Sequence, residues 1–273
     1  MKKLYFLIVV LLINILPIYA QLSLTLATHG VVPGDVYSYF YGDTTNFKPG
    51  AGGANVTWTY TGWDIGTMLQ TINYVDPATT PYASSFPTAT FAAGQEGAYA
   101  YYKSGTTGFF TEGVADSTKT LVYPDDEKMN PYPFTYTTSS VDYFSGSVII
   151  TGYNVSRYGK ITTTGDGWGK LVINSRTYNN VLRVKFFQEM TDNQINVSTG
   201  DTVVKLHYLI TTYHWYRSNS KNPIINYSET KVYSNLSSDT LSAKEIFVDY
   251  LVTAINDNRS ELMNFSIYPN PGK

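Results

Sequence analysis

Cysteine is absent from this chain of 273 residues. Disulfide bonds are therefore excluded, and so is a bacterial lipid anchor, which is attached to a cysteine just after the export signal. Charged residues are also scarce, at 15%. No run of Lys and Arg follows residue 3. We therefore do not expect nucleic acid as a partner, because phosphate binding depends on clustered basic side chains.

Histidine is limited to His29, His207 and His214. His207 and His214 lie seven residues apart in a strand-like segment, and this odd spacing places them on opposite faces. The motifs HExxH and GxSxG and a phosphate-binding glycine loop are missing as well. The sequence therefore predicts neither a metal site nor a cofactor.

A long apolar run lies at the start of the chain. Two lysines, the apolar stretch 4–18 and then Ala20 have the order of a secretory signal peptide. As a helix, the stretch would span roughly 22 Å, which is less than the roughly 30 Å hydrocarbon core of a bilayer. We expect residues 1–20 to be cleaved after Ala20, leaving no permanent membrane span. An uncleaved anchor is the alternative.

Aromatic residues are abundant, with 25 tyrosines in the chain. Many of them fall in segments that alternate between two faces, such as NVTWTYT, in which Val56, Trp58 and Tyr60 share one face. We interpret glycine-rich stretches such as TTGDGWG, residues 163–169, as turns between strands. The pattern predicts an all-β domain over residues 21–255. Its expected form is an antiparallel β-sandwich or barrel-like sandwich with many short strands and little helix.

The stretch Asp76 to Gly94 differs from its surroundings, because it has three prolines, many small residues and no alternation. We expect an extended loop that lies across the sheet and is held by Tyr82, Phe86 and Phe91. The sequence does not indicate what this loop does. Polar residues 256–263 are interpreted as a linker between the β domain and the tail.

The last ten residues, 264–273, read NFSIYPNPGK. They resemble the start of the C-terminal sorting domain of type IX secretion substrates of Bacteroidetes, in which an aromatic strand leads into a YPNP turn. The matching residues are Phe265, Tyr268, Pro269, Asn270 and Pro271. The resemblance implies a tail recognised by the export machinery, of which residues 264–273 would be the truncated start. An ordinary turn is the alternative, because proline fixes φ.

Residues 45–225 carry a second resemblance. Blocks such as PGAGGANVTWTYTGW and YHWYRSNSKNPIINY are similar to a group of secreted Bacteroidetes proteins that usually carry this sorting tail. The chain departs from that pattern at Thr59, where the group usually has Asp, and at residues 174–176, where it usually has a Pro-Asn-Gly turn. The resemblance implies a fold and a secreted or cell-surface location, and it transfers no catalytic residue.

The segment YPDDEK, residues 123–128, contains three consecutive acids, Asp125, Asp126 and Glu127. Glycoside hydrolysis needs a pair of carboxyl groups about 5–10 Å apart across a cleft, so these residues are candidate catalytic groups. The favoured interpretation is an acidic turn that faces water.

The segment HYLITTYHWY is apolar on both faces, with Tyr213 and Trp215 on one of them. A central strand covered on both sides is the favoured interpretation. The functional alternative is a platform for sugar rings or an apolar partner, in which Trp215 and Tyr213 act with Trp168 and Tyr158.

Together these features predict an exported protein at the cell surface or in the medium, with a structural or binding role and a glycan or another protein as its ligand. We interpret the protein as a non-enzyme rather than as an enzyme. A polysaccharide-acting glycoside hydrolase that uses the acids at 125–127 is one alternative, and an adhesin or matrix component is another. The sequence determines neither the ligand nor the oligomeric state.

Overall fold

The computed structural model describes residues 21–150 and 152–252. The predicted signal peptide (1–20), linker (256–263) and sorting tail (264–273) lie outside the described residues. Among the described residues, no helix has both the length and the apolar character needed to cross a membrane.

Strands make up most of the described chain, which confirms the all-β prediction. The strands are β1 (Val36–Gly42), β2 (Gly53–Tyr60), β3 (Ile65–Val75), β4 (Phe91–Gln95), β5 (Ala98–Gly105), β6 (Gly108–Ala115), β7 (Thr120–Asn130), β8 (Ser139–Ile150), β9 (Tyr153–Ile173), β10 (Arg176–Asn196), β11 (Thr202–Tyr216), β12 (Ile225–Ser234) and β13 (Ser237–Asp249). The helical pieces are α2 (Leu26–His29), η1 (Pro77–Thr79), η2 (Ala83–Ser85) and η3 (Tyr250–Val252).

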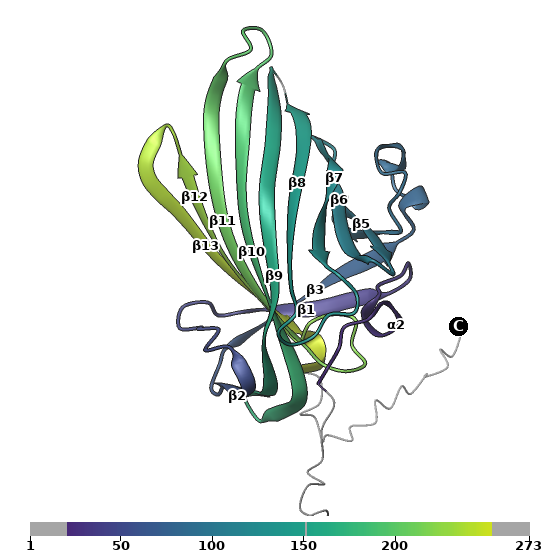
Figure 1. Cartoon of the computed structure of the whole chain (residues 1–273), viewed down its shortest axis with the longest axis vertical. Coiled ribbons are helices and arrows are strands. Elements are labelled where there is room, and N and C mark those ends of the chain that lie inside the picture. The colour runs from purple at the N-terminus through teal and green to yellow at the C-terminus, as the bar shows by residue number, and fades with distance from the viewer. Residues whose placement is uncertain (1–20, 151, 253–273) are drawn as a thin grey trace, which may run out of the picture.

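Twelve of the strands close into an antiparallel barrel. The order runs from β9 through β10, β11, β12, β13, β1, β3, β4, β5, β6 and β7 to β8, which pairs again with β9. β2 stands outside this ring and runs parallel to the second half of β9. In Figure 1, β8 to β13 form a tall curved wall, and β1 and β3 cross near its base. Of the two predicted all-β forms, the chain therefore adopts the barrel.

Short strands were predicted, but several strands are long. β9 and β10, for example, each span 21 residues. The TTGDGWG stretch was predicted to be a turn, and this prediction is wrong: it lies within β9. Its glycines serve close backbone contacts instead. A Cβ atom on Gly169 (φ +156°) would lie 2.0 Å from the carbonyl oxygen of Val56, and one on Gly165 would lie 2.2 Å from that of Thr135. Only glycine fits where β2 and the 131–138 connection meet β9.

An apolar cluster fills part of the barrel interior, including Phe144, Ile161 and Val184 from the wall. The segment before β1 enters this cluster through Leu24, whose backbone exchanges two hydrogen bonds of 2.8 and 2.9 Å with Phe134. Because these two segments occupy the interior, the barrel has a packed core where they lie.

Two further clusters lie on the outer face. In the first, the connection between β1 and β3, which contains Phe47 and Trp58, packs on Trp215 and Ile225 of the wall. In the second, the 76–90 loop packs Phe86 on Tyr101 of β5, with ring centroids 3.9 Å apart.

The loop prediction is therefore partly confirmed, because Tyr82 and Phe86 both pack against the sheet. It is wrong at its end, because Phe91 already belongs to β4 and faces the interior. Residues 244–249 belong to β13. The helical turn η3 begins only at Tyr250.

Candidate functional site

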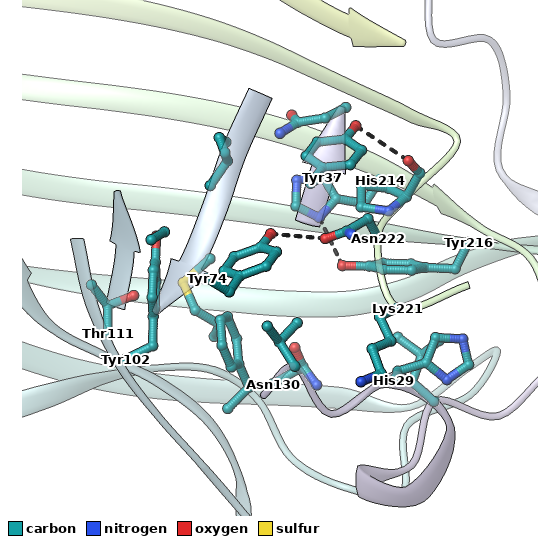
Figure 2. A pocket seen from close by; sticks show the side chains of 18 of the residues that line it. His29, Tyr37, Tyr74, Tyr102, Thr111, Asn130, His214, Tyr216, Lys221 and Asn222 are labelled. Carbon is teal, nitrogen blue, oxygen red and sulfur yellow. Dashed lines mark hydrogen bonds between the residues drawn. The ribbon is translucent and has the colours of Figure 1, made fainter. Parts of the chain in front are cut away.

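A cavity of ≈ 390 Å³ lies inside the barrel. Its wall comes from strands on nearly every side, namely β1, β3 to β7 and β10 to β13. Its base is formed by the segment before β1 and by the β11–β12 connection, residues 217–224. Figure 2 shows side chains from these elements pointing toward a shared space. The size falls within the roughly 300–1,000 Å³ of ligand pockets.

Three aromatic rings stack on one another along one side of the cavity. Phe91 of β4, Tyr102 of β5 and Phe109 of β6 lie on consecutive strands, and their planes differ by only 12–22°. Their ring centroids are 5.2 to 6.0 Å apart. Tyr74 of β3 meets Phe91 edge-on at 5.6 Å. Near-parallel rings at these distances overlap face to face with an offset, so together they form a rigid apolar wall of the cavity.

The base of the cavity is tied to the wall by polar contacts. The Tyr74 hydroxyl donates to Asn222 Oδ1 at 2.8 Å, and the Tyr37 hydroxyl donates to the Pro223 carbonyl at 3.3 Å (Figure 2). Lys221 forms an ion pair with Asp35 at 2.6 Å. The β11–β12 connection is thus held to β1, to β3 and to the segment before β1.

Two histidines line the cavity, and burial keeps both neutral at pH 7. Burial lowers the pKa of His214 to about 4, and its Nδ1 lies 3.0 Å from the Tyr216 hydroxyl. Burial also lowers the pKa of His29, whose Nε2 donates to the Arg217 carbonyl at 3.3 Å. His207 lies on the opposite face of β11 from His214, as alternation predicts, with its Nδ1 3.3 Å from Thr191 Oγ1. Within residues 21–150 and 152–252, no three His, Cys, Asp or Glu side chains gather as metal ligands.

Glu127 brings a carboxyl group to the cavity from β7, and its side chain is only 5% exposed. Gln188 of β10 donates its Nε2 to Glu127 Oε1. The pKa of Glu127 is raised to about 7. Burial is the main cause, Asp142 adds to the rise, and Gln188 and Arg157 act against it. The group therefore changes charge near neutral pH.

Arg157 and Asp192 form a two-point ion pair inside the barrel, close to Glu127. The guanidinium donates to both carboxylate oxygens at 2.7 Å, and its Nη1 donates to the Tyr123 hydroxyl at 3.0 Å. Asp142 accepts the backbone N–H of Lys128 at 2.8 Å. We refer to Glu127, Asp142, Arg157 and Asp192 as the acidic cluster.

The prediction of an acidic turn at residues 125–127 is wrong, because all three acids lie in β7. Asp125 is exposed, and Asp126 forms an ion pair with Lys103, which also lies 3.6 Å from Glu112. Only Glu127 enters the barrel. Proline usually marks a turn, but here Pro124 sits where the pairing of β7 with β8 is irregular.

The four predicted binding aromatics do not form one surface. Trp215 is fully buried beneath the β1–β3 connection, so no sugar ring can stack on it. Tyr213 packs against the same cluster. Tyr158 is 47% exposed on β9, and Trp168 lies ten residues further along that strand, which corresponds to roughly 33 Å.

Trp168 lines a second cavity, of ≈ 480 Å³, between β2 and the β9–β10 hairpin. Its other lining residues are Asn55, Val56, Thr57, Gly169, Lys170, Asn179 and Asn180. The indole of Trp168 thus shares this cavity with the side-chain amides of three asparagines.

Sequence reasoning did not find the interior cavity residues, such as Tyr74, Tyr102 and Gln188. Alternation along each strand shows that these residues share one face of it. Only the closure of the sheet into a barrel makes that face an interior surface. Comparison of the chain with protein-family models, curated proteins and solved structures gave no match. Function must therefore be argued from the geometry of these sites.

Proposed function

We propose that the protein is an exported binding protein that holds a small and mainly apolar molecule inside its barrel. The observation that carries this proposal is the ≈ 390 Å³ cavity with its wall of near-parallel rings. Ligand pockets are typically concave and apolar, with a few polar groups that orient the ligand. Export to the cell surface or medium by the type IX route rests on the sequence patterns of residues 1–20 and 264–273.

Small side chains help to keep this space open. Ala93 of β4 lines the cavity, where a larger apolar residue would extend the core. The polar lining residues Glu127 and Gln188 are hydrogen-bonded to each other. A ligand can therefore contact the rings of Phe91 and Tyr102 and reach a hydrogen-bonding edge.

The test is a titration with N-phenyl-1-naphthylamine, an uncharged probe whose fluorescence rises in apolar surroundings. The protein is expected to bind one probe molecule with saturation. Ala93→Phe fills the cavity and should weaken binding at least tenfold, while Val141→Phe adds the same ring at an exposed position on β8 and should leave it unchanged. Absence of saturable binding, or equal binding by both variants, would contradict the proposal. Thermal unfolding of each variant shows that it is folded.

A second candidate function, glycan binding, is favoured by the cavity at Trp168. Side-chain amides pair with sugar hydroxyls, and an indole face covers the apolar face of a sugar ring. A glycan array with Trp168→Ala and Asn179→Ala tests this, with Tyr158→Ala as an exposed aromatic control. Retention of a glycan that both test variants lose and the control keeps is the expected result. An array without any retained glycan would rule it out.

A hydrolase and an adhesin have less support. A hydrolase built on residues 125–127 needs two carboxyl groups on one cavity, whereas only Glu127 enters the barrel, where its bonding partner is the amide of Gln188. An adhesin or matrix component is expected to offer a large apolar patch and no pocket. The interior cavity favours small-molecule binding over both.

A further inference from the structure

Carboxyl groups outnumber cations in the acidic cluster beside the cavity. Arg157 is matched by Asp192 through two bonds of 2.7 Å. Asp142 accepts a backbone N–H of Lys128. Glu127 is bound by the neutral amide of Gln188, and no cation within the described part of the chain pairs with it. Glu127 is therefore a buried carboxyl group at the cavity edge that has no ion-pair partner of its own, and Arg157, which is bonded to Asp192, offsets its charge only in part.

We propose that Glu127 is the anchor for a positively charged amine, so that the cavity ligand is an aromatic amine. This inference rests on the proposed function, because it requires a ligand in the barrel. The ring of such a ligand would pack against the wall made by Phe91, Tyr102 and Phe109, and its ammonium group would face Glu127.

Two physical effects favour an amine over a neutral molecule of the same shape. The folded protein has already removed Glu127 from water, so an ammonium group supplies a countercharge to a group whose desolvation is complete. The faces of nearby aromatic rings also attract a cation, by about 0.5–2 kcal/mol. Tyr102 and Phe109 lie next to each other in that wall, with centroids 5.2 Å apart.

An anionic ligand is disfavoured by the same surroundings. His29 and His214 are neutral at pH 7, because burial lowers the pKa of each. Lys221 is already paired with Asp35. An anion in the cavity would therefore meet Glu127 without meeting an unpaired cation among the described lining residues.

The charge of Glu127 also gives the binding a pH dependence. The charged and titratable groups that face it are Asp142 of β8, Arg157 of β9, Tyr102 of β5 and Tyr123 of β7. Burial raises the pKa of Tyr102 to about 12 and also raises that of Tyr123, so neither tyrosine ionises near neutral pH. With a pKa of about 7, about half of the Glu127 carboxyl groups carry a proton at pH 7, and binding of an ammonium group releases that fraction.

The experiment compares three probes that share an indole ring, namely tryptamine, 3-methylindole and indole-3-acetate. Isothermal titration at pH 8 should show tryptamine binding at least tenfold tighter than 3-methylindole, with indole-3-acetate weakest. Glu127→Gln should reduce tryptamine to the affinity of 3-methylindole and leave 3-methylindole unchanged. Glu112→Gln is the matched control, because Glu112 is a buried carboxyl group on the outer face beside Lys103.

A second readout follows the proton. At pH 7, the heat of tryptamine binding should depend on the ionisation enthalpy of the buffer, and Glu127→Gln should remove this dependence while Glu112→Gln keeps it. If tryptamine binds no better than 3-methylindole, including binding of neither, while N-phenyl-1-naphthylamine still binds, the amine inference is overturned and the binding function stands. If N-phenyl-1-naphthylamine also fails to bind, both are overturned.

Discussion

The guanidinium carbon of Arg183 lies 5.5 Å from the ring centroid of Trp215. Tyr213 and Trp58 complete an aromatic box around it, at 4.9 and 5.1 Å. Arg183 is only 1% exposed, and it donates to both carboxylate oxygens of Asp166 at 2.8 and 2.9 Å. Two of the four aromatic residues that the sequence offered as a sugar platform, Tyr213 and Trp215, therefore flank a buried cation instead.

Arg183→Lys should destabilise the protein by about 3 kcal/mol. A lysine keeps the charge but loses the planar two-point contact with Asp166 and the stacking on Trp215, and a buried charge without full pairing is costly. Urea unfolding measures the loss. Lys185→Arg is the control, because Lys185 neighbours Arg183 on β10 and approaches Tyr213 from 5.9 Å. A change below about 0.5 kcal/mol for Arg183→Lys would mean that the box does not stabilise the fold.

The alternation around Tyr213 and Trp215 predicted the strand itself, with apolar cover on both faces. β11 confirms this, because His214 faces the cavity and Trp215 faces the outer cluster. The sequence could not show what supplies the outer cover. That cover is the β1–β3 connection with Phe47, more than 150 residues earlier in the chain. Local periodicity reports that a face is buried, and only the tertiary fold determines what buries it.

Glu127→Gln should change how stability depends on pH. The pKa of this carboxyl group is raised from 4.5 to about 7 on folding. Its contribution to stability is therefore fully present below pH 4.5 and is lost as the pH rises through 7. Glutamine carries no such dependence. Relative to the unsubstituted protein, the variant should gain about 3 kcal/mol between pH 4.5 and 8.5.

Urea unfolding at both pH values measures this difference, with Glu112→Gln as the control for a buried carboxyl group. A gain of equal size at both pH values would show that Glu127 is not protonated more readily in the folded protein.

The position of Glu127 also shows the limit of reading acids from sequence. Three adjacent acids after a proline are typical of a solvated turn. In β7 the alternation places Glu127 inside and Asp126 outside, against Lys103. The partner that stabilises Glu127, Gln188, lies on β10 and carries no local signal of its own. The candidate cavity was therefore not predictable, although the all-β class was.

Asp192→Asn should destabilise the barrel by about 3 kcal/mol, because it removes the negative charge and one of the two oxygens that accept from Arg157, and so leaves a buried charge without a bonded carboxylate. Replacing both members of the pair, in Arg157→Met with Asp192→Leu, should recover much of this loss. The double-mutant cycle in urea unfolding measures the coupling. Asp125→Asn, at an exposed position on the same barrel, should change stability by less than about 0.5 kcal/mol. Equal effects of Asp192→Asn and Asp125→Asn would contradict a buried pair.

Phe86→Ala should release the 76–90 loop from the outer face. The rings of Phe86 and Tyr101 stack at 3.9 Å with 9° between their planes. Deleting a buried phenyl ring costs about 3–5 kcal/mol where the site cannot collapse. Cleavage of the loop by proteinase K should therefore become much faster, at a temperature where the rest of the chain stays folded. Met68→Ala removes a side chain that is 70% exposed and should leave the cleavage rate unchanged. Resistance of the loop in Phe86→Ala would show that other contacts hold it.

Tyr74→Phe should loosen the base of the cavity without changing its shape. The lost hydroxyl donates to Asn222 at 2.8 Å, and a hydrogen bond of this kind contributes about 1 kcal/mol. Amide protons of residues 218–222 should then exchange about fivefold faster, since that factor corresponds to about 1 kcal/mol. Tyr233→Phe, at a position 39% exposed, is the control and should leave exchange unchanged.

If the β11–β12 connection opens to admit ligand, N-phenyl-1-naphthylamine should also leave the Tyr74→Phe barrel faster. Faster amide exchange with an unchanged probe release rate would place the entrance elsewhere on the barrel.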